Sequence, residues 1–306
     1  ASDLARTYSY GGGCGIDLSK LRPKGASTNN AAKESTGPIS FMDIFSQVTG
    51  TISQAGRRGA LMVSLDVNHP DIEEFIDCKT DLNRVTYANI SVRVNDVFMR
   101  AVETDSDYLL TWPCDSDVKS ARYVTMWPKE YNTLVKVGDT YVKKVKAKQL
   151  FQKLAENNWN YAEPGILYWD RISNYNLLST DEKFAYAGVN PCAEEPLPAG
   201  GSCLLGSINL SEFVKDGVFV TNEFIDAVHI AVTALNDVLD EGLELHPLDI
   251  QRQTVGDYRQ IGLGVFGYAD MLIKMGLRYG SKEANEFTDY VGDLLISESI
   301  RQSAEL

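Results

Sequence analysis

The stretch "ALMVSLDVNHPDIEEFI", residues 60–76, decides the fold class, because a strand and a helix follow each other within it. Residues 60–67 form an apolar run that predicts a buried strand. His69-Pro70 then opens a helix, in which Ile72, Phe75 and Ile76 recur at helical spacing. The stretch therefore predicts one strand–helix unit.

The same alternation continues outward from this unit. Further strands and helices are predicted at 40–54 (helix), 83–96 (strand), 145–156 (helix), 165–170 (strand), from about 221 (helix) and at 260–277 (a strand that turns into a helix). Strands separated by helices, with crossovers long enough for parallel pairing, give the fold class α/β.

Composition limits the function classes. The chain has 306 residues, of which 44% are hydrophobic, so it can fill a globular core. A net charge of −13 argues against a nucleic-acid polymer as partner, because a polyphosphate selects for clustered Lys and Arg. Single nucleotides stay possible, since a few N–H groups and one or two arginines suffice to bind them. No signal peptide or membrane helix is predicted.

The cysteines and histidines show no metal or disulfide pattern. The five cysteines contain no CxxC pair, which argues against a disulfide scaffold or structural zinc and favours a reducing cytoplasm: Cys14, Cys78, Cys114, Cys192 and Cys203. The three histidines share no ligand spacing: His69, His229 and His246. We therefore predict no metal site, and each histidine is expected at a helix end or on the surface.

The stretch "NPCAEEPLPAGGSC", residues 190–203, carries the chemistry. In an extended or hairpin-like loop, Asn190, Cys192 and Glu194 would lie on one face. The carboxylate can accept a proton, the amide can hold an oxygen, and the sulfur can act as nucleophile or, after one-electron oxidation, abstract a hydrogen atom. The alternative is a solvated Pro-rich loop with an incidental buried cysteine.

Extended to residue 210, this stretch resembles the finger loop of the catalytic chain of ribonucleotide reductases, in which Asn-x-Cys-x-Glu is followed by a Cys shortly before Asn-Leu. Five other segments resemble that family in the same order: "GGGCGIDLSKLRPKGA" (11–26), "STGPISFMDIF" (35–45), "SQAGRRGALM" (53–62), "NHPDIEEFI" (68–76) and "GLGVFGYADML" (262–272). Together they span nearly the whole chain.

The resemblance implies part of one ten-stranded α/β barrel domain. Residues 1–185 would form most of its first five-stranded half, 186–210 the finger loop and the segment after it, and 211–306 the start of the second half. The chain opens on Ala1 rather than Met, and its last helical pattern stops at Leu306 without a terminator. We therefore expect a piece of a longer catalytic chain.

The resemblance also implies reduction of ribonucleotides to 2′-deoxyribonucleotides. Cys192 would become a thiyl radical and take the 3′-hydrogen, and Glu194 would be the base for the 3′-hydroxyl. Asn190 would bind the ribose near the departing 2′-hydroxyl. Cys203 would be one of two thiols that deliver the reducing electrons.

Two further groups of residues follow from the resemblance. Three would bind the substrate: Gly12, Gly13 and Arg58. Four would face a nucleoside triphosphate or deoxynucleoside triphosphate effector: Arg22, Lys24, Gln54 and Arg57. The loop "QAGRRG" (54–59) would couple effector and substrate, with a glycine near each end to let it switch. The alternatives are a flexible glycine turn and solvated charges.

Several parts of the family pattern are missing. The partner of Cys203 would lie upstream of Ala1, and Cys14 is expected to be a buried structural thiol instead. The phosphate-binding loop and a C-terminal cysteine pair are also absent, so we expect no turnover by the isolated chain. The complete enzyme would bind a ribonucleoside di- or triphosphate, form a homodimer with the rest of its catalytic chain, and be reduced by thioredoxin or glutaredoxin. The radical would come from adenosylcobalamin or from a separate metal-containing subunit. Residues 11–25 and 190–203 resemble the adenosylcobalamin-dependent members of the family more closely, which favours the first source.

Two other functions are weighed against this one. Residues 262–267 spell GxGxxG and suggest an NAD(P)-dependent dehydrogenase, but "DYRQI" before them is too polar for a good first strand. Tight packing between strand and helix explains these glycines better. The other alternative is a non-catalytic nucleotide-binding fragment or half of a split enzyme.

Overall fold

The computed structural model of the chain describes residues 1–306 except 27, 29–30, 55 and 114–134. Cys114 therefore lies outside the described residues. Strands alternate with helices along the chain, which confirms the predicted α/β class. The chain forms two compact units, residues 1–199 and 200–306, and each is described by itself.

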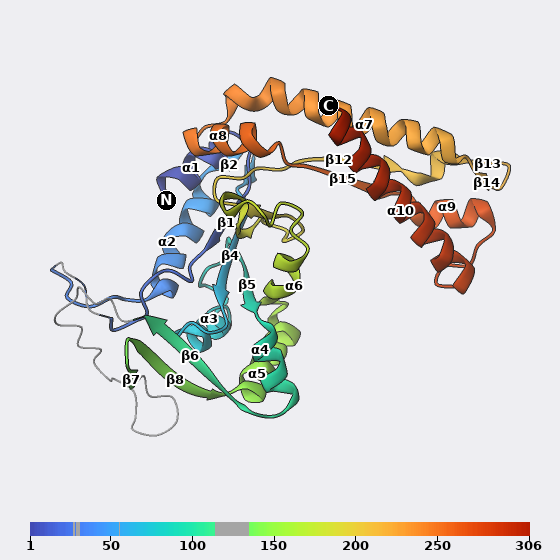
Figure 1. Cartoon of the computed structure of the whole chain (residues 1–306). Helices are drawn as coiled ribbons and strands as arrows, with labels where there is room; N and C mark the ends of the chain where they lie inside the picture. Colours follow the sequence, from blue (N-terminus) through green and yellow to red (C-terminus); the bar gives the residue numbers. More distant parts are fainter. Residues whose placement is uncertain (27, 29–30, 55, 114–134) are drawn as a thin grey trace. The chain divides into compact units, whose positions relative to one another are not determined.

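The first unit is built on a parallel sheet of four strands (Figure 1). These strands are β1 (Cys14–Asp17), β4 (Leu61–Asp66), β5 (Asn89–Val94) and β9 (Gly165–Tyr168). Their order in the sheet is β1-β4-β5-β9, and every pair is parallel. Because strands that follow one another along the chain are also neighbours in space, the sheet winds in one direction, as in a barrel.

Helices cover one face of this sheet. They are α1 (Ser2–Ser9), α2 (Pro38–Thr51), α3 (Ile72–Asp77), α4 (Asp96–Glu103) and α5 (Ala147–Tyr161). Helix α6 (Trp169–Asn174) follows β9, and its Trp169 and Ile172 pack with Met62 on the other face. Val63 and Leu65 of β4 and Val92 of β5 point into the core beneath the helices and are fully buried. Side chains alternate along a strand, so Met62 and Ser64 belong to the opposite face.

Between α2 and α5, the described residues form two small additional sheets. An antiparallel sheet between α4 and α5 has the order β6-β8-β7 and comprises β6 (Asp107–Pro113), β7 (Val135–Val137) and β8 (Thr140–Lys146). A short hairpin after α2 pairs β2 (Ser53–Gln54) with β3 (Arg57–Arg58). A 3-10 turn, η1 (Glu182–Phe184), precedes the segment that carries Cys192.

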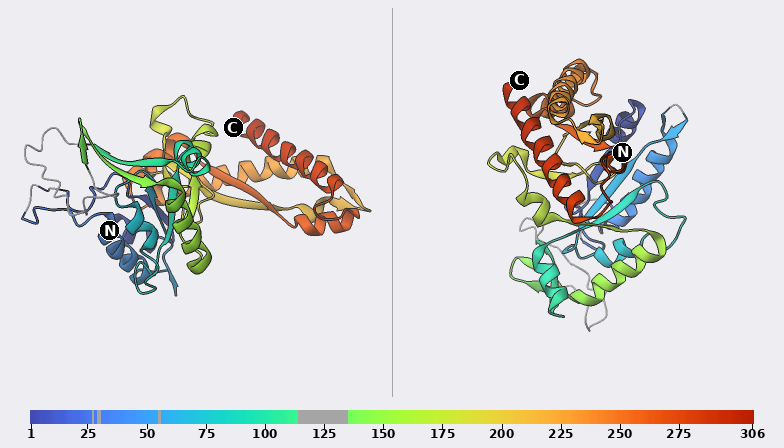
Figure 2. Two further views of the ribbon diagram at one scale, coloured as in Figure 1. Left: turned by 90° about the horizontal axis from the view of Figure 1, so that it is seen from below. Right: turned by 90° about the vertical axis from the view of Figure 1, so that its right-hand side faces the viewer.

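The second unit has a parallel pair, β12 (Leu204–Asn209) and β15 (Ile261–Phe266). Between and after them come η2 (Leu210–Phe213), β13 (Val214–Lys215), β14 (Val218–Phe219), α7 (Thr221–Gly242), η3 (Leu243–Leu245), α8 (Asp249–Tyr258), α9 (Tyr268–Met275) and α10 (Lys282–Glu305). Helices α7 and α10 lie side by side (Figure 2). Phe224, Val228 and Met271 are fully buried in the core of the second unit.

The GxGxxG run lies mostly inside strand β15. Gly262 and Gly264 pair with Leu205 and Ser207 of β12, whereas a dinucleotide fingerprint needs its glycines in the turn after a strand. Gly267 has a φ of 70° at the start of α9, and a Cβ there would lie 2.0 Å from Asn209 Oδ1. Close packing against Asn209 therefore accounts for Gly267, whereas a Cβ on Gly264 would make only an ordinary contact, with Ser207 Oγ at 3.7 Å. Among the helices of the described ranges, none has the length and apolarity needed to cross a membrane.

Candidate active site

Cys192 lies at the tip of a hairpin. Strand β10 (Tyr186–Val189) pairs antiparallel with β11 (Pro196–Pro198). The Asn190 N–H donates to the Glu195 carbonyl at 3.2 Å, and the Glu195 N–H donates to Asn190 Oδ1 at 3.0 Å. These bonds close the loop and leave the Cys192 side chain exposed.

The loop itself is a tight turn. The Ala193 N–H donates to the Asn190 carbonyl at 3.1 Å, and Ala193 has a left-handed φ of 70°. The hairpin-like form anticipated from the sequence is therefore the one that occurs. Simple alternation does not hold across it, however, because Ala193 breaks the extended backbone between Cys192 and Glu194. Both of these side chains are exposed.

The hairpin is docked on the face of the parallel sheet opposite helices α1 to α5. Strand β1 and the glycine before it lie very close to the hairpin. A Cβ on Gly15 would lie 1.6 Å from the Val189 carbonyl oxygen, and a Cβ on Gly13 would lie 2.7 Å from Pro191 Cγ. Asn89 Nδ2 donates to the Pro191 carbonyl at 3.2 Å. Val189 and Ala193 also pack in a small apolar cluster with Met62 and Leu167. The structure thus brings the glycine run next to the Cys192 loop.

A charged cluster lies toward the carboxyl ends of the strands. Arg93 Nη1 is 3.0 Å from Asp17 Oδ2, and its guanidinium carbon is 3.6 Å from the ring centre of Trp169. Ser64 Oγ donates to Asp17 at 2.7 Å. Burial raises the pKa of neighbouring Asp66, although Arg93 opposes the shift. The sequence analysis did not identify this cluster.

The four described cysteines are reduced and differ in environment. Burial raises the pKa of Cys14 to about 11 and that of Cys78 to about 12, so neither thiol ionises near neutral pH. Cys203 belongs to the second unit, where it immediately precedes β12 and is half-buried. Cys192 is the exposed one of the four.

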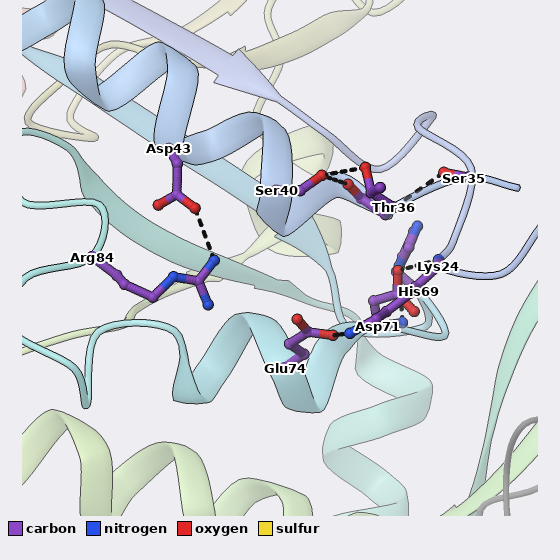
Figure 3. Close-up of polar contacts among 10 residues, drawn as sticks. Lys24, Ser35, Thr36, Ser40, Asp43, His69, Asp71, Glu74 and Arg84 are labelled. Carbon is purple, nitrogen blue, oxygen red and sulfur yellow. Dashed lines mark hydrogen bonds and ion pairs between the residues drawn. The ribbon is translucent and has the colours of Figure 1, made fainter. Parts of the chain in front are cut away.

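The segment that carries Arg22 and Lys24 is held on the start of helix α3 (Figure 3). The Lys24 N–H donates to Asp71 Oδ2 at 2.8 Å, and its ammonium lies 3.3 Å from Glu74 Oε2. His69 Nε2 donates to the Leu21 carbonyl at 3.0 Å and Nδ1 accepts the Asp71 N–H at 3.1 Å, which fits the neutral ring. His69 is buried just before α3, so of the two places expected for it, a helix end or the surface, it occupies the helix end.

Burial shifts the pKa values of His69 and Asp71 in opposite directions. It lowers the pKa of His69 to about 4 and raises that of Asp71 to about 6. His69 takes up its proton more readily in the unfolded chain, so between pH 4 and 6.5 it makes stability rise with pH. Asp71 holds its proton more readily in the folded chain, so between its ordinary value of 3.8 and pH 6 it makes stability fall with pH. The two effects largely offset each other below pH 6.

The predicted coupling loop is the β2–β3 hairpin. Gln54 pairs with Arg57, Gly56 has a φ of 87° at the turn, and the side chains of Arg57 and Arg58 are exposed. Arg22 and Lys24 lie on a separate segment. The structure therefore places the four predicted effector residues on two elements of the first unit.

The end of this hairpin rests on Tyr8, which the sequence analysis missed. Tyr8 is fully buried, its hydroxyl lies 3.0 Å from Thr49 Oγ1, and a Cβ on Gly59 would lie 2.9 Å from its ring. The last turn of α1 also holds the glycine run, since the Gly12 N–H donates to the Thr7 carbonyl at 3.1 Å. No local pattern distinguishes Tyr8 from an ordinary core tyrosine.

The sequence of the chain is similar to those of known proteins. The sequence profile of the family described as "Ribonucleotide reductase, barrel domain" matches residues 1–306. A vitamin B12-dependent ribonucleoside-diphosphate reductase of Thermoplasma acidophilum is 35% identical over 99% of this chain and 36% of its own length. A vitamin B12-dependent ribonucleotide reductase of Streptomyces avermitilis is 32% identical over 98% of this chain and 31% of its own.

A ribonucleoside-diphosphate reductase subunit alpha of Chlamydia muridarum, 28% identical, is matched over the whole chain and 30% of its own length. The chain thus spans about a third of the length of these relatives. The full-length match to the barrel domain, together with the parallel sheet and the docked cysteine hairpin, shows that the chain belongs to the ribonucleotide reductase family.

Proposed function

We propose that this chain is part of a catalytic chain that reduces ribonucleotides to 2′-deoxyribonucleotides through a thiyl radical on Cys192. The observation that carries the proposal is the exposed thiol at the tip of a hairpin docked on the glycine run of a parallel sheet. A radical centre needs a fixed position and access to its substrate, and this hairpin provides both.

The residues of the loop would divide the chemistry. The sulfur of Cys192 takes the hydrogen atom from C3′, and Glu194 accepts the proton of the 3′-hydroxyl. The 2′-hydroxyl then leaves as water. Cys203 and a second thiol supply two electrons and two protons and close a disulfide, after which Cys192 returns its hydrogen atom to C3′. Asn190 already uses Oδ1 to close the loop, so its Nδ2 is the group offered to the ribose.

Substrate and effector would be bound by different elements. Gly12 and Gly13 let a base approach the backbone, and Arg58 is the cation on the substrate side. Arg22, Lys24, Gln54 and Arg57 would face the phosphates of a nucleoside or deoxynucleoside triphosphate. Lys24 can turn to a phosphate at small cost, because its ion pair with Glu74 is largely exposed and such pairs contribute only about 0–1 kcal/mol.

The names of the relatives favour adenosylcobalamin as the radical source over a separate metal-containing subunit. This chemistry requires a reduced, accessible thiol, and Cys192 is both. When bound, adenosylcobalamin would supply the one-electron oxidant of that thiol. The complete protein would be cytoplasmic, act on ribonucleoside di- or triphosphates as a homodimer, and be reduced by thioredoxin or glutaredoxin.

A chimera tests the activity. Residues 1–306 replace the matching segment of the Thermoplasma acidophilum relative, and deoxynucleotide formation is measured with adenosylcobalamin and a dithiol. We expect product from the chimera, none from its Cys192→Ser variant, and product from Cys78→Ser, whose thiol is buried elsewhere. Equal product from the Cys192→Ser variant would refute the proposal and favour a non-catalytic nucleotide-binding module.

A further inference from the structure

The segment between α3 and β5 lies along one face of helix α2. Arg84 Nη2 donates to Asp43 Oδ2 at 2.9 Å (Figure 3), and the Tyr87 N–H donates to Ser46 Oγ at 2.9 Å. A Cβ on Gly50 would lie 2.3 Å from the ring of Tyr87. Residues 43, 46 and 50 are spaced by three and four positions, so they share one side of the helix.

This segment is itself firmly held. Val85 is buried in the core and has a left-handed φ of 48°, a conformation that β-branched residues rarely adopt. Such a residue persists only where its surroundings over-determine it, and strained residues of this kind gather at functional sites. The contacts on both sides of Val85, at Arg84 and Tyr87, supply that constraint.

The ring of Tyr87 reaches the end of α2 where the β2–β3 hairpin begins. There the guanidinium carbon of Arg58 lies 5.7 Å from the ring centre, which is within the range of a cation–π contact. The residue after Arg58 is fixed to the same helix, because the Gly59 N–H donates to the Thr49 carbonyl at 3.2 Å. Arg58 is therefore held by an aromatic ring from a different segment of the chain.

We propose that Tyr87 is a positioning residue, which fixes Arg58 and thereby sets how strongly an effector changes the choice of ribonucleotide. The role of Arg58 rests on the proposed function, whereas its contact with Tyr87 does not. The ring of Tyr87 lies against Gly50 of helix α2 and against Arg58 of the hairpin. It would therefore limit the movement of the Arg58 side chain relative to α2. Without the contact to Tyr87, the Arg58 side chain would be more flexible and would discriminate less between the bases of different ribonucleotides.

Hydrogen exchange on the 306-residue chain tests the positioning. In Tyr87→Leu, which removes the aromatic face, we expect the Gly59 N–H and its neighbours in β3 to exchange about two- to fivefold faster than in the wild type. Tyr87→Phe keeps the ring and should restore the wild-type rate. Leu82→Ala, an exposed change in the same segment, is the matched control and should have no effect. Unchanged exchange in Tyr87→Leu would overturn the positioning role.

The chimera described above tests the consequence for specificity. The ratio of kcat/KM values for two ribonucleotides is measured with and without each deoxynucleoside triphosphate. We expect the effector-induced change in that ratio to shrink about two- to fivefold in Tyr87→Leu and to return in Tyr87→Phe. An unaltered ratio in Tyr87→Leu, with faster hydrogen exchange, would overturn the specificity role. A wild-type chimera without product would refute the proposed function instead, and hydrogen exchange would still decide whether Tyr87 holds Arg58.

Discussion

Replacing Gly15 with alanine should lift the Cys192 hairpin from the sheet. The new Cβ would lie 1.6 Å from the Val189 carbonyl oxygen, whereas carbon and oxygen atoms rarely approach within about 3 Å. The obstacle is backbone on both sides, so no side chain can rotate away and the hairpin must move by more than about 1 Å. Such overpacking costs about 1–3 kcal/mol, and displacement also endangers the hydrogen bond from Asn89 to Pro191, which contributes about 1 kcal/mol.

The variant has a close control. Gly188→Ala alters the same hairpin at a position where a Cβ would meet no atom within 4 Å. Urea unfolding should show a loss of about 2–4 kcal/mol in Gly15→Ala and less than about 0.5 kcal/mol in Gly188→Ala. In the active chimera, Gly15→Ala should lower kcat about 100-fold, since a shift of about 1 Å can have that effect. Equal stability and equal kcat in the two variants would refute the docked position of the hairpin.

Two further predictions concern titration. Asp71→Asn removes the group that offsets His69. Between pH 4 and 6 the free energy of unfolding of the variant should therefore rise with pH more steeply than that of the wild type, by up to about 1.4 kcal/mol per pH unit. Parallel urea-derived profiles of the two proteins would contradict this. Cysteine labelling by iodoacetamide at pH 8 can be followed by peptide mass spectrometry. Cys192 should be labelled at least about tenfold faster than Cys14 and Cys78, because burial raises the pKa values of Cys14 and Cys78. Faster labelling of Cys14 would show that its surroundings are open.

Elements with a strong local pattern were predictable from the sequence. The apolar run at 60–67 is strand β4, and the helix expected from about 221 begins at Thr221. The helix expected at 40–54 spans Pro38–Thr51, because Pro38 at its first turn and Gly37, with a φ of 81°, set its start. Local periodicity thus identifies an element, while its ends depend on backbone conformations that the pattern does not encode.

The site was predictable only in part. The motif identified the segment with Cys192, but not the left-handed Ala193 that turns it, since alanine gives no signal for a positive φ. Contacts between distant residues were also missed. Tyr87 meets Arg58, and Gly15 meets Val189, at sequence separations that no periodic pattern spans. Such contacts arise from the way the strands and helices pack, and they become visible only in the folded structure.

Release of tritium from the sugar tests the role of Cys192 most directly. A ribonucleotide labelled with tritium at C3′ is incubated with the chimera under turnover conditions, and label in the solvent and in the product is counted. The account predicts that cleavage of the C3′–H bond, seen as washout of label or as a tritium isotope effect, disappears in Cys192→Ser and persists in Cys78→Ser. Cleavage of that bond at an undiminished rate in Cys192→Ser would contradict the account.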